Sequence, residues 1–391
     1  MKKVVSFVML LVFLMSTCVC VSAENKTKNR AELYSSIEPQ LSHDTFSFYL
    51  CEAKTGKVLC ANNEFSRASP ASVTKIMTLL LVMEALESGK FELTDRVTVS
   101  AKAASMGGSQ VFLEEGERIT VEELIKSAVI ASGNDASVAL AELTAGSEAA
   151  FVKMMNQRAA ELGLKNSNFE NTTGLDDTTT NHYTCAADIA KMSRELIRHQ
   201  LILKYSSLWQ DSIRNGEFIL TNTNRLVRYY EGCNGLKTGS TDKAGFCISA
   251  TAKRGNMQLI AVVMGAETRD ERNTIARELL DFGFANFALY ECGEAFVENS
   301  RVLGGVKDET GLYCTPFATV VPKSELSRVE LVYDIPETIY APLEAGSAVG
   351  KVVYKINDEQ IGESEIVVKE SINKITYGEI LMRIIKRMVA C

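Results

Sequence analysis

The sequence predicts an α+β protein that consists of a large mixed domain, a small all-β module and a C-terminal amphipathic helix. Helical and strand patterns are intermixed from about residue 45 to residue 290, which indicates an α+β domain. Beyond residue 293, short β-branched runs alternate with Gly and Asp/Asn turns, which is typical of an all-β module. The composition is that of a folded protein, because 46% of the 391 residues are hydrophobic and 23% are charged.

The first 23 residues predict a cleavable secretory signal peptide. Two lysines precede an apolar run from Val4 to Met15, and residues 21–23 are small enough for cleavage. The apolar run ends too early for a membrane-spanning helix. A lipoprotein signal fits less well, because no small residue precedes Cys18 or Cys20. We therefore expect an exported protein.

The net charge and the histidine content exclude several function classes. Phosphate backbones require clustered excess Lys and Arg, so a formal charge of −7 argues against nucleic acid as a partner. Three histidines are too few for a multi-histidine metal site. No Gly-rich nucleotide motif, G-x-S-x-G elbow or H-E-x-x-H motif occurs. The sequence therefore predicts a protein without a metal ion or cofactor.

The first predicted strand covers residues 45–50 and leads into a hairpin that turns at Thr55-Gly56. This turn would pair residue 54 with residue 57 and place Cys51 opposite Cys60. Opposed cysteines could form a disulfide in an oxidising compartment, and two reduced strand residues are an equally consistent interpretation. The other cysteines of the mature chain are scattered, with no C-x-x-C pair.

A helix over residues 73–87 is apolar nearly all round, which is typical of a central buried helix. The region from 166 to 181 is rich in loop-forming residues. The other elements predicted for the large domain are helices at 121–145, 148–162, 186–198 and 268–284, with Thr120 and Ser147 as N-caps of the first two, and core strands at 245–251 and 257–265. The strand-like runs of the C-terminal module lie at 319–321, 329–333, 348–354 and 365–368.

The sequence Ser72-Val73-Thr74-Lys75 stands at the start of the buried helix. Residues three apart share a helix face, so the hydroxyl of Ser72 and the amine of Lys75 are expected to lie close together. A serine hydroxyl needs a nearby base, and a lysine can serve when burial lowers its pKa. The helix N-terminus favours negative charge that develops at an attacked carbonyl. By itself the S-x-x-K pattern is common, and a capping serine with a surface lysine would also explain it.

Two further motifs complete an ordered set with the first. Ser132-Gly133-Asn134 interrupts a helical stretch, and Lys237-Thr238-Gly239 precedes the core strand at 245–251. S-x-x-K, S-D-N and K-T-G together mark penicillin-binding proteins and class A β-lactamases, and here Gly133 replaces the Asp of the middle motif. S-x-x-K and K-T-G each recur elsewhere in the chain, but only Ser72 and Lys237 bracket the single S-G-N in this order. Chance assembly of the set is improbable.

On these motifs the chain resembles the low-molecular-mass penicillin-binding proteins, specifically the D-alanyl-D-alanine carboxypeptidases. The similarity runs from about residue 45 to the C-terminus, and it departs at Cys185, where the family has Thr. It implies a penicillin-binding serine D,D-peptidase/β-lactamase-like domain. Further matching segments are Pro70–Thr78, Ser132–Ala136, Asn168–Phe169, Gly174–Asp176, His182–Thr184, Gly235–Gly239 and Ala244–Cys247.

The resemblance implies a catalytic role for four residues. Ser72 is similar to the nucleophile that attacks the penultimate D-Ala carbonyl and becomes acylated, and Lys75 is similar to the base that takes its proton. Ser132 resembles the hydroxyl that relays a proton to the leaving D-Ala nitrogen, and Asn134 resembles the amide that orients Lys75 or the substrate.

The resemblance also implies a substrate-binding strand edge. Lys237, together with Thr238, is expected to bind the terminal carboxylate of the substrate, for which a cation is well suited. The oxyanion hole is expected to consist of the backbone N–H of Ser72 and that of a residue after Gly239, such as Thr241.

Two other residues in the matching segments are interpreted as structural. His182 has no evident partner in the sequence, and a lone histidine is more often structural than catalytic. Cys247 lies in a predicted core strand and is expected to be a packed thiol.

The last residues form a basic amphipathic helix that is too short and too charged to span a bilayer. Its apolar residues fall at 380, 381, 384, 385, 388 and 389, opposite Glu379, Arg383, Lys386 and Arg387. Such a helix could lie in the outer face of the cytoplasmic membrane or pack on the β module. The resemblance favours the membrane, because the carboxypeptidases use such a tail as an anchor.

The predicted organisation is a signal peptide at 1–23, a lead-in at 24–44, a D,D-peptidase domain at 45–292, a β-rich domain at 293–372 and an anchor helix at 373–391. The resemblance implies a carboxypeptidase that removes the terminal D-Ala from peptidoglycan stem pentapeptides, acts in cell-wall biogenesis and is acylated by β-lactam antibiotics. A serine β-lactamase fits less well, because the histidine segment and the β module match carboxypeptidases. The motifs are also compatible with a D,D-endopeptidase that uses the same machinery, and with a non-catalytic wall-binding protein.

Overall fold

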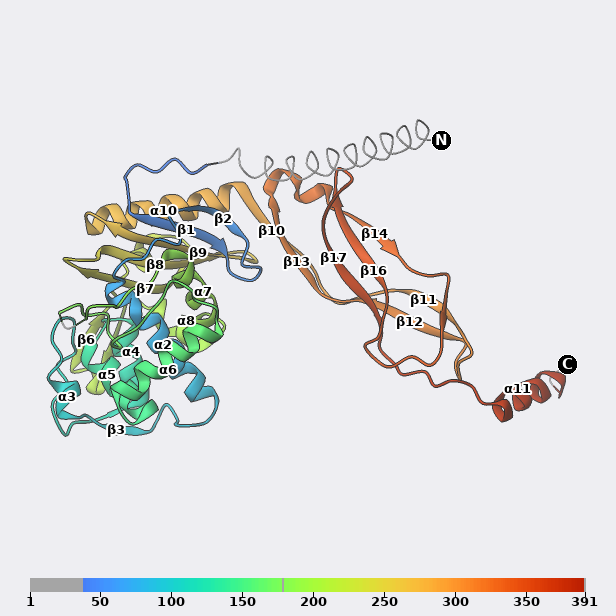
Figure 1. Cartoon of the computed structure of the whole chain (residues 1–391), viewed down its shortest axis with the longest axis horizontal. Coiled ribbons are helices and arrows are strands. Elements are labelled where there is room, and N and C mark those ends of the chain that lie inside the picture. The colour runs from blue at the N-terminus through green and yellow to red at the C-terminus, as the bar shows by residue number, and fades with distance from the viewer. Residues whose placement is uncertain (1–37, 178, 390–391) are drawn as a thin grey trace, which may run out of the picture.

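The computed structural model of the chain describes residues 38–177 and 179–389. The predicted signal peptide and most of the predicted lead-in lie outside the described residues. The described part consists of a mixed domain, a β module beside it and a C-terminal helix at the far end of the module (Figure 1). This is the α+β architecture that the sequence predicts.

A five-stranded antiparallel sheet forms the centre of the large domain. Its strand order is β2-β1-β9-β8-β7, so β7 is an edge strand. One face packs against α10 (Arg269–Asn286), and the other face packs against α7 (Ala186–Leu196) and the helices beyond it (Figure 1). The strands are β1 (Ser47–Glu52), β2 (Val58–Asn62), β7 (Cys233–Thr241), β8 (Gly245–Arg254) and β9 (Met257–Ala266).

Helix α2 (Lys75–Glu87) is the core of the helical half, as its uniform apolar pattern predicts. All but three of its thirteen residues are buried. It packs against α4 (Val121–Val129), α5 (Asn134–Ala145), α6 (Glu148–Glu161) and α7. A helix can be apolar on every side only when neighbours cover every side, and four neighbours do so here.

The helix predicted at 121–145 is two helices, α4 and α5, separated by residues 130–133. Ser132 takes a positive φ of 62°, which helical geometry does not allow. The predicted caps are confirmed: Thr120 forms a capping box with Glu123, and the Ser147 side chain accepts from the backbone N–H of Ala150. The break brings Ser132 out of the helix and into the cleft described below.

The hairpin prediction is wrong in its register. Glu52 pairs with Lys57 through its backbone N–H, Cys51 pairs with Val58, and a bulge then brings Cys60 opposite Leu50. The buried Glu52 carboxylate accepts from the backbone N–H groups of residues 54 and 55, and so it stabilises a wider turn than the predicted one. Cys51 packs into the core on one side of the sheet and Cys60 against the core on the other, so both thiols are free.

Shorter elements complete the large domain. They include η1 (Ala71–Thr74), α3 (Ala101–Ala104), β4 (Arg118–Thr120), β5 (Gln210–Ile213) and β6 (Phe218–Thr221). The others are β3 (Arg96–Thr98), α8 (Gln200–Ser206), η2 (Arg214–Gly216) and α9 (Leu226–Tyr229).

The C-terminal module is built from strands, as predicted, around a separate small core. Its main sheet has the order β14-β16-β17-β12-β11-β15. Strand β10 (Phe287–Cys292) pairs with β13 (Phe317–Pro322), so backbone hydrogen bonds cross the boundary predicted at residue 292. The strands of the main sheet are β11 (Ala295–Leu303), β12 (Glu309–Cys314), β14 (Glu330–Asp334), β15 (Thr338–Tyr340), β16 (Ala348–Ile356) and β17 (Glu359–Val368), and η3 (Lys323–Arg328) follows β13.

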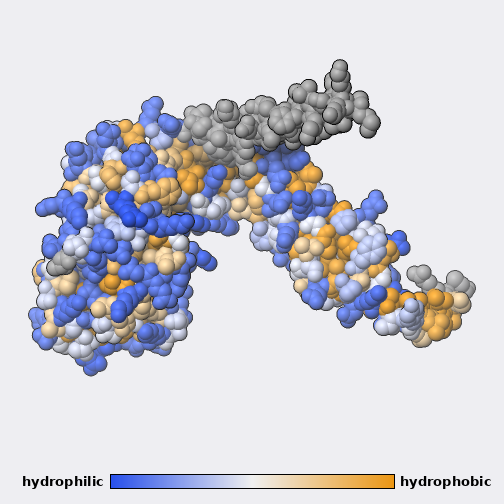
Figure 2. All heavy atoms as spheres, viewed as in Figure 1, coloured by the Kyte–Doolittle hydropathy of each residue, from blue (hydrophilic) through white to orange (hydrophobic). Residues whose placement is uncertain are grey.

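Helix α11 (Tyr377–Val389) extends from the end of the module that is remote from the large domain (Figure 1). Its side-chain contacts with the module include hydrogen bonds from Arg383 to Asp308, at 2.6 Å, and to the carbonyl of Val306. Apolar side chains remain on its surface, which is largely hydrophobic in the space-filling view (Figure 2). Among the described residues, no helix has both the length and the apolar character needed to cross a membrane.

Candidate active site

A polar cleft lies where η1, the α4–α5 break and the edge strand β7 meet. The three predicted motifs, which are 60 and 105 residues apart in the sequence, each contribute to its wall. The residues that line the cleft are Ser72, Ser109, Ser132, Thr223, Thr238, Gly239, Ser240, Arg269 and Arg272.

Ser72 lies in η1, one turn before α2 begins. Ala71, directly before it, has a positive φ of 47°, a conformation that is costly for a residue with a Cβ. The chain is held in this conformation by burial, because Ala71, Val73 and Thr74 are all buried while Ser72 stays partly open to the cleft. The Ser72 hydroxyl therefore faces the cleft from a rigid turn.

Lys75 is fully buried in the first turn of α2. Burial lowers its pKa well below the usual value, and the nearby Lys237 lowers the pKa further, whereas Asp135 opposes the shift. Its Nζ lies 2.9 Å from the Ser72 Oγ, 2.6 Å from the Asn134 Oδ1 and 3.1 Å from the Thr173 carbonyl oxygen. The geometry thus places an amine of lowered basicity against the serine hydroxyl.

The three contacts of Lys75 determine the direction of proton transfer. A neutral amine has two N–H donors and one lone pair. Asn134 Oδ1 and the Thr173 carbonyl can only accept, so they take the two N–H groups. The lone pair is left to accept from the Ser72 hydroxyl, which is the arrangement that a general base requires.

Ser132 and Asn134 are positioned by the break between α4 and α5. Ser132 is 3% exposed, and its Oγ accepts from the Nζ of Lys237 at 2.8 Å. The side-chain Nδ2 of Asn134 donates to the Gly107 carbonyl at 2.7 Å, which leaves Oδ1 facing Lys75. The middle motif therefore contacts both lysines of the site.

Lys237 is buried in the edge strand β7. Burial lowers its pKa to about 7, and the positive charge of Arg272 contributes to the shift. Its Nζ donates to Ser132 Oγ and, at 2.9 Å, to the carbonyl of Thr238. An ammonium in this position is suited to attract the carboxylate of a ligand in the cleft.

Gly239 allows β7 to approach the nucleophile closely. A Cβ at this position would lie 2.7 Å from the backbone nitrogen of Ser72 and 2.8 Å from that of Val73. Such distances exclude every residue with a side chain unless η1 moves. The glycine of the third motif is therefore required by packing against the first motif.

The structure favours Ser240 over Thr241 as the cleft residue that follows Gly239. Ser240 lines the cleft, whereas the hydroxyl of Thr241 donates to the Asp176 carboxylate at 2.6 Å. Successive residues of a strand point to opposite sides, so only one of the two can face the cleft. The side chain of Thr241 thus points away from the cleft, whereas the choice of Thr241 for the second oxyanion N–H stays a prediction.

Besides Ser240, sequence reasoning missed four residues of the cleft wall. Arg269 and Arg272 come from the first turn of α10, and Ser109 and Thr223 come from loops. Two arginines in the first turn of a helix oppose the helix dipole, and this was the signal that could have revealed the α10 pair. Together with Lys237, the two arginines make positive the end of the cleft where the carboxylate of the substrate is expected to bind.

His182 and Cys247 are buried, in agreement with their structural interpretation. The backbone N–H of Glu170 donates to His182 Nδ1 at 3.1 Å, so the neutral ring carries its proton on Nε2, 2.8 Å from the Thr74 hydroxyl. Burial lowers the pKa of His182 to about 4 and raises the pKa of the Cys247 thiol to about 11. Neither side chain lines the cleft.

A family model described as D-alanyl-D-alanine carboxypeptidase matches residues 34–268, and one described as penicillin-binding protein 5, C-terminal domain, matches residues 284–374. The chain is similar to the D-alanyl-D-alanine carboxypeptidase DacF of Bacillus subtilis, with 41% identity over 98% of both chains.

Two solved structures are similar to this chain in fold. Penicillin-binding protein 5 from Haemophilus influenzae is similar over 86% of this chain and 99% of its own, with 33% identity and a TM-score of 0.76. Penicillin-binding protein D2 from Listeria monocytogenes, in its ampicillin-bound form, is similar over 63% of this chain and all of its own, with 28% identity and a TM-score of 0.58.

Proposed function

The chain belongs to the D-alanyl-D-alanine carboxypeptidase family and is a serine-type carboxypeptidase, and we propose that Ser72 carries its chemistry as the acylated nucleophile. The family match covers residues 34–268, which include every cleft-lining residue except the two arginines of α10. The observation that carries the proposal is the contact of Lys75 Nζ with both Ser72 and Asn134, combined with that of Lys237 with Ser132.

In the acylation step, the terminal carboxylate of the pentapeptide binds at Lys237 and the α10 arginines. Ser72 Oγ attacks the penultimate D-Ala carbonyl while Lys75 takes the hydroxyl proton. The resulting oxyanion is stabilised by backbone N–H groups, for which we propose those of Ser72 and Ser240. Ser132 then passes a proton to the leaving nitrogen and takes one in return from the Lys75 ammonium, so that free D-Ala departs and the Lys75 amine is neutral again.

In the deacylation step, a water molecule attacks the ester carbonyl. The neutral amine of Lys75 takes a proton from the water, and Ser72 Oγ recovers its proton as the shortened peptide leaves. A β-lactam follows the same first step, because its ring amide replaces the peptide bond. We expect its ester to persist longer, because the leaving group remains attached.

The carboxylate of Glu170, which a β-lactamase could use for deacylation, does not face the cleft. Glu170 is exposed and accepts from the backbone N–H groups of Thr180 and Asn181 in its own loop, each at 2.9 Å. It does not line the cleft. This contact pattern supports a carboxypeptidase over a β-lactamase.

The proposal is tested by covalent labelling and product release. Protein that lacks residues 1–23 and the tail (residues 378–391) should form an adduct with fluorescent penicillin that survives denaturing gel electrophoresis. It should also release D-Ala from a stem pentapeptide. Ser72→Ala should abolish both. Persistent labelling of Ser72→Ala would show that another residue is the nucleophile. Release of D-Ala from the pentapeptide, compared with cleavage of cross-linked peptide dimers, would separate carboxypeptidase from endopeptidase activity.

For α11 we propose attachment to the outer face of the cytoplasmic membrane. Its apolar residues at 380, 381, 384, 385, 388 and 389 are 39% to 82% exposed. Lys386 lies on the same short helix, as does Arg383, which in this structure pairs with Asp308 of the module, so positive charge is available locally although the net charge of the chain is acidic. An exported enzyme held in this way would act on the cell wall next to the membrane.

A further inference from the structure

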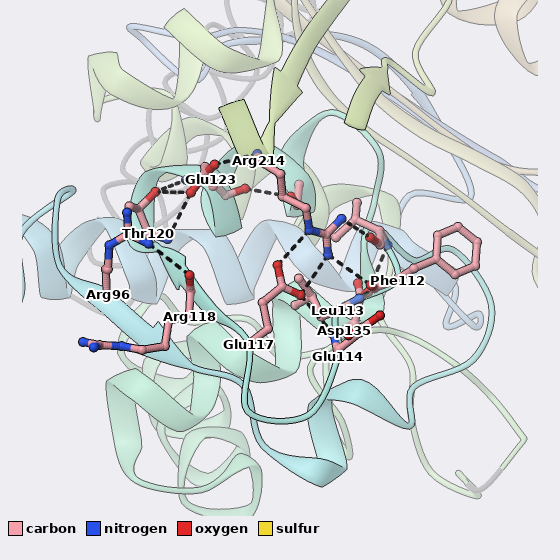
Figure 3. A network of polar contacts seen from close by, with 12 residues as sticks. Arg96, Phe112, Leu113, Glu114, Glu117, Arg118, Thr120, Glu123, Asp135 and Arg214 are labelled. Atoms are coloured by element: carbon pink, nitrogen blue, oxygen red, sulfur yellow. Dashed lines mark hydrogen bonds and ion pairs between the residues drawn. The ribbon is translucent and has the colours of Figure 1, made fainter. Parts of the chain in front are cut away.

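The loop of residues 109–117, between α3 and β4, forms one wall of the active-site cleft through Ser109. We propose that Arg214, which follows β5, is a positioning residue that holds this loop against the Ser132–Asn134 motif and thereby orients Asn134 towards Lys75. Figure 3 shows the contacts of Arg214 with the loop. The inference rests on the proposed function of the cleft.

Arg214 binds the loop through every nitrogen of its guanidinium group. Its Nε and Nη2 donate to the two carboxylate oxygens of Glu117 at 2.7 and 2.9 Å. Its Nη1 donates to the Val111 carbonyl, and Nη2 also donates to the Phe112 carbonyl, both at 3.0 Å. Two parallel bonds to a carboxylate fix direction as well as distance, and a lysine cannot reproduce them.

Asp135 holds the same loop through its backbone amides. Its Oδ2 accepts from the backbone N–H groups of Val111 and Leu113, at 2.9 and 3.1 Å, and the side chain is fully buried. The carbonyls of this turn therefore bind Arg214 while its amides bind Asp135 (Figure 3). Arg214, Glu117 and Asp135 thus form a polar clamp on this turn. The clamp ends beside the active site, because Asp135 is the neighbour of Asn134 on α5.

The start of this loop, together with Gly107 two residues before it, determines which end of the Asn134 side chain faces the base. The Gly107 carbonyl accepts from Asn134 Nδ2, and the Ser109 carbonyl accepts from the backbone N–H of Asn134, both at 2.7 Å. With Nδ2 held in this way, Oδ1 accepts from Lys75. If the loop moved, the amide could rotate and present a donor to Lys75, and the orientation of the lysine lone pair would be lost.

Burial alone does not hold this loop in place. Phe112 is 64% exposed and has a positive φ of 56°, which is unfavourable for an aromatic residue. Its ring lies edge-on to that of Phe218, with 6.2 Å between centroids. Arg214 itself has a positive φ of 52°, and its backbone N–H donates to Glu123 in the capping box of α4. Val111 and Leu113, on either side of Phe112, are buried in the core, and the polar contacts of Arg214 and Asp135 act together with this packing to maintain the strained conformation.

Arg158 provides a matched control. It forms ion pairs with two carboxylates, Glu84 and Glu161, and its side chain is 27% exposed compared with 23% for Arg214. It lies on α6, and within the described part of the chain its ion pairs and hydrogen bonds reach no residue of the cleft wall. Arg158→Gln therefore measures what the loss of such an ion pair does to stability alone.

The test compares the variants Arg214→Gln, Arg214→Lys and Arg158→Gln with the wild-type sequence, all in the protein that lacks residues 1–23 and the tail. We expect Arg214→Gln to lower the rate of Ser72 acylation at saturating fluorescent penicillin about tenfold or more, because small displacements of a catalytic group have effects of this size. The apparent dissociation constant should change less than about threefold, since Lys237 and the α10 arginines are untouched. Arg214→Lys should recover part of the rate.

Arg158→Gln should acylate at the wild-type rate with a similar change in melting temperature. Wild-type acylation in Arg214→Gln, or an equal loss in Arg158→Gln, would overturn the positioning role. If Arg214→Gln does not fold, Glu117→Gln serves in its place, because it removes the bidentate pair and leaves the carbonyl contacts; an unchanged rate in that variant would also overturn the inference. Failure of the proposed function is distinguishable, because the wild-type protein itself would then not be labelled.

Discussion

Two buried lysines have different tasks because their neighbours differ. Lys75 is surrounded by acceptors that leave its lone pair to Ser72, whereas Lys237 donates to Ser132 from the carboxylate end of the cleft. Burial lowers the pKa of both lysines most, the positive charge of Arg272 adds to the shift of Lys237, and the charge of Lys237 adds to that of Lys75. Burial and the neighbouring positive charges thus act together to lower the basicity of Lys75, the proposed base.

The pKa of Lys237 predicts an alkaline limb in the pH profile. Below about pH 7 the free enzyme carries an ammonium at this position, and above it the group loses its charge. We therefore expect kcat/KM for pentapeptide to fall as the pH rises through about 7. Arg272→Gln should move this limb to higher pH, because it removes a neighbouring positive charge. An unchanged limb in Arg272→Gln would contradict this explanation of the profile.

Gly239→Ala should abolish acylation while the protein still folds. The added Cβ would meet the backbone of Ser72 at 2.7 Å, so η1 must shift and carry the nucleophile away from Lys75. Labelling with fluorescent penicillin and circular dichroism spectra measure the two effects. Gly255→Ala is a suitable control, because a Cβ at Gly255 meets no atom within 4 Å, although its positive φ adds some strain. Wild-type labelling of Gly239→Ala would show that the close approach is not needed.

At the level of elements, the long loop between α6 and α7 is attached to the start of α2. Gly174 makes this possible, because a Cβ there would lie 1.7 Å from the Ala71 carbonyl oxygen. His182 adds a second attachment through the Thr74 hydroxyl, and Asp176 connects the loop to β7 through Thr241. The loop that supplies the Thr173 carbonyl to Lys75 is therefore held at three points.

His182 predicts a loss of stability in acid. Its pKa is about 4 in the folded protein and about 6.5 when unfolded, so the unfolded chain binds the proton first as the pH falls. Stability should fall between about pH 6.5 and about pH 4 by up to about 3 kcal/mol from this group. Urea unfolding at about pH 7 and about pH 4.5 measures the change. In His182→Gln the pH dependence should be smaller, and an identical dependence would contradict the assignment.

The hairpin of β1 and β2 shows why the pairing of two elements can be predicted wrongly from the sequence. The strand pattern of β1 and β2 was predicted, but its register depended on the turn. A buried carboxylate, Glu52, binds the turn amides and widens the turn, which no local pattern reveals. The consequence is large, because the two cysteines that the turn would have opposed lie on different faces of the sheet.

At the level of the whole molecule, the β module separates the large domain from α11 (Figure 1). The cleft lies in the large domain, and the exposed apolar residues of α11 lie at the opposite end of the chain. If α11 binds the membrane, the module acts as a spacer that keeps the active site away from the lipid surface.

Deletion of residues 378–391 should release the protein from anionic vesicles without changing D-Ala release from a soluble pentapeptide. The physical reason is that the apolar area and the basic residues of α11 act together at the bilayer surface. Co-sedimentation with vesicles measures binding, and a full-length Ile384→Lys, Ile385→Lys variant is the control that keeps the chain length. Unchanged sedimentation of either variant would favour packing of the helix on the module.

The sequence by itself determined the α+β architecture, the capped helices, the three motifs and the amphipathic tail, because each depends on residues close together in the chain. Only the tertiary structure decided that Ser240 rather than Thr241 lines the cleft, that Thr173 and Asn134 direct the lone pair of Lys75, and that Arg214 clamps the cleft wall. These features join segments that lie far apart in the chain, such as Arg214 and Val111, which are 103 residues apart. Their distances are set by how the helices and the sheet pack, and no local sequence pattern records that packing.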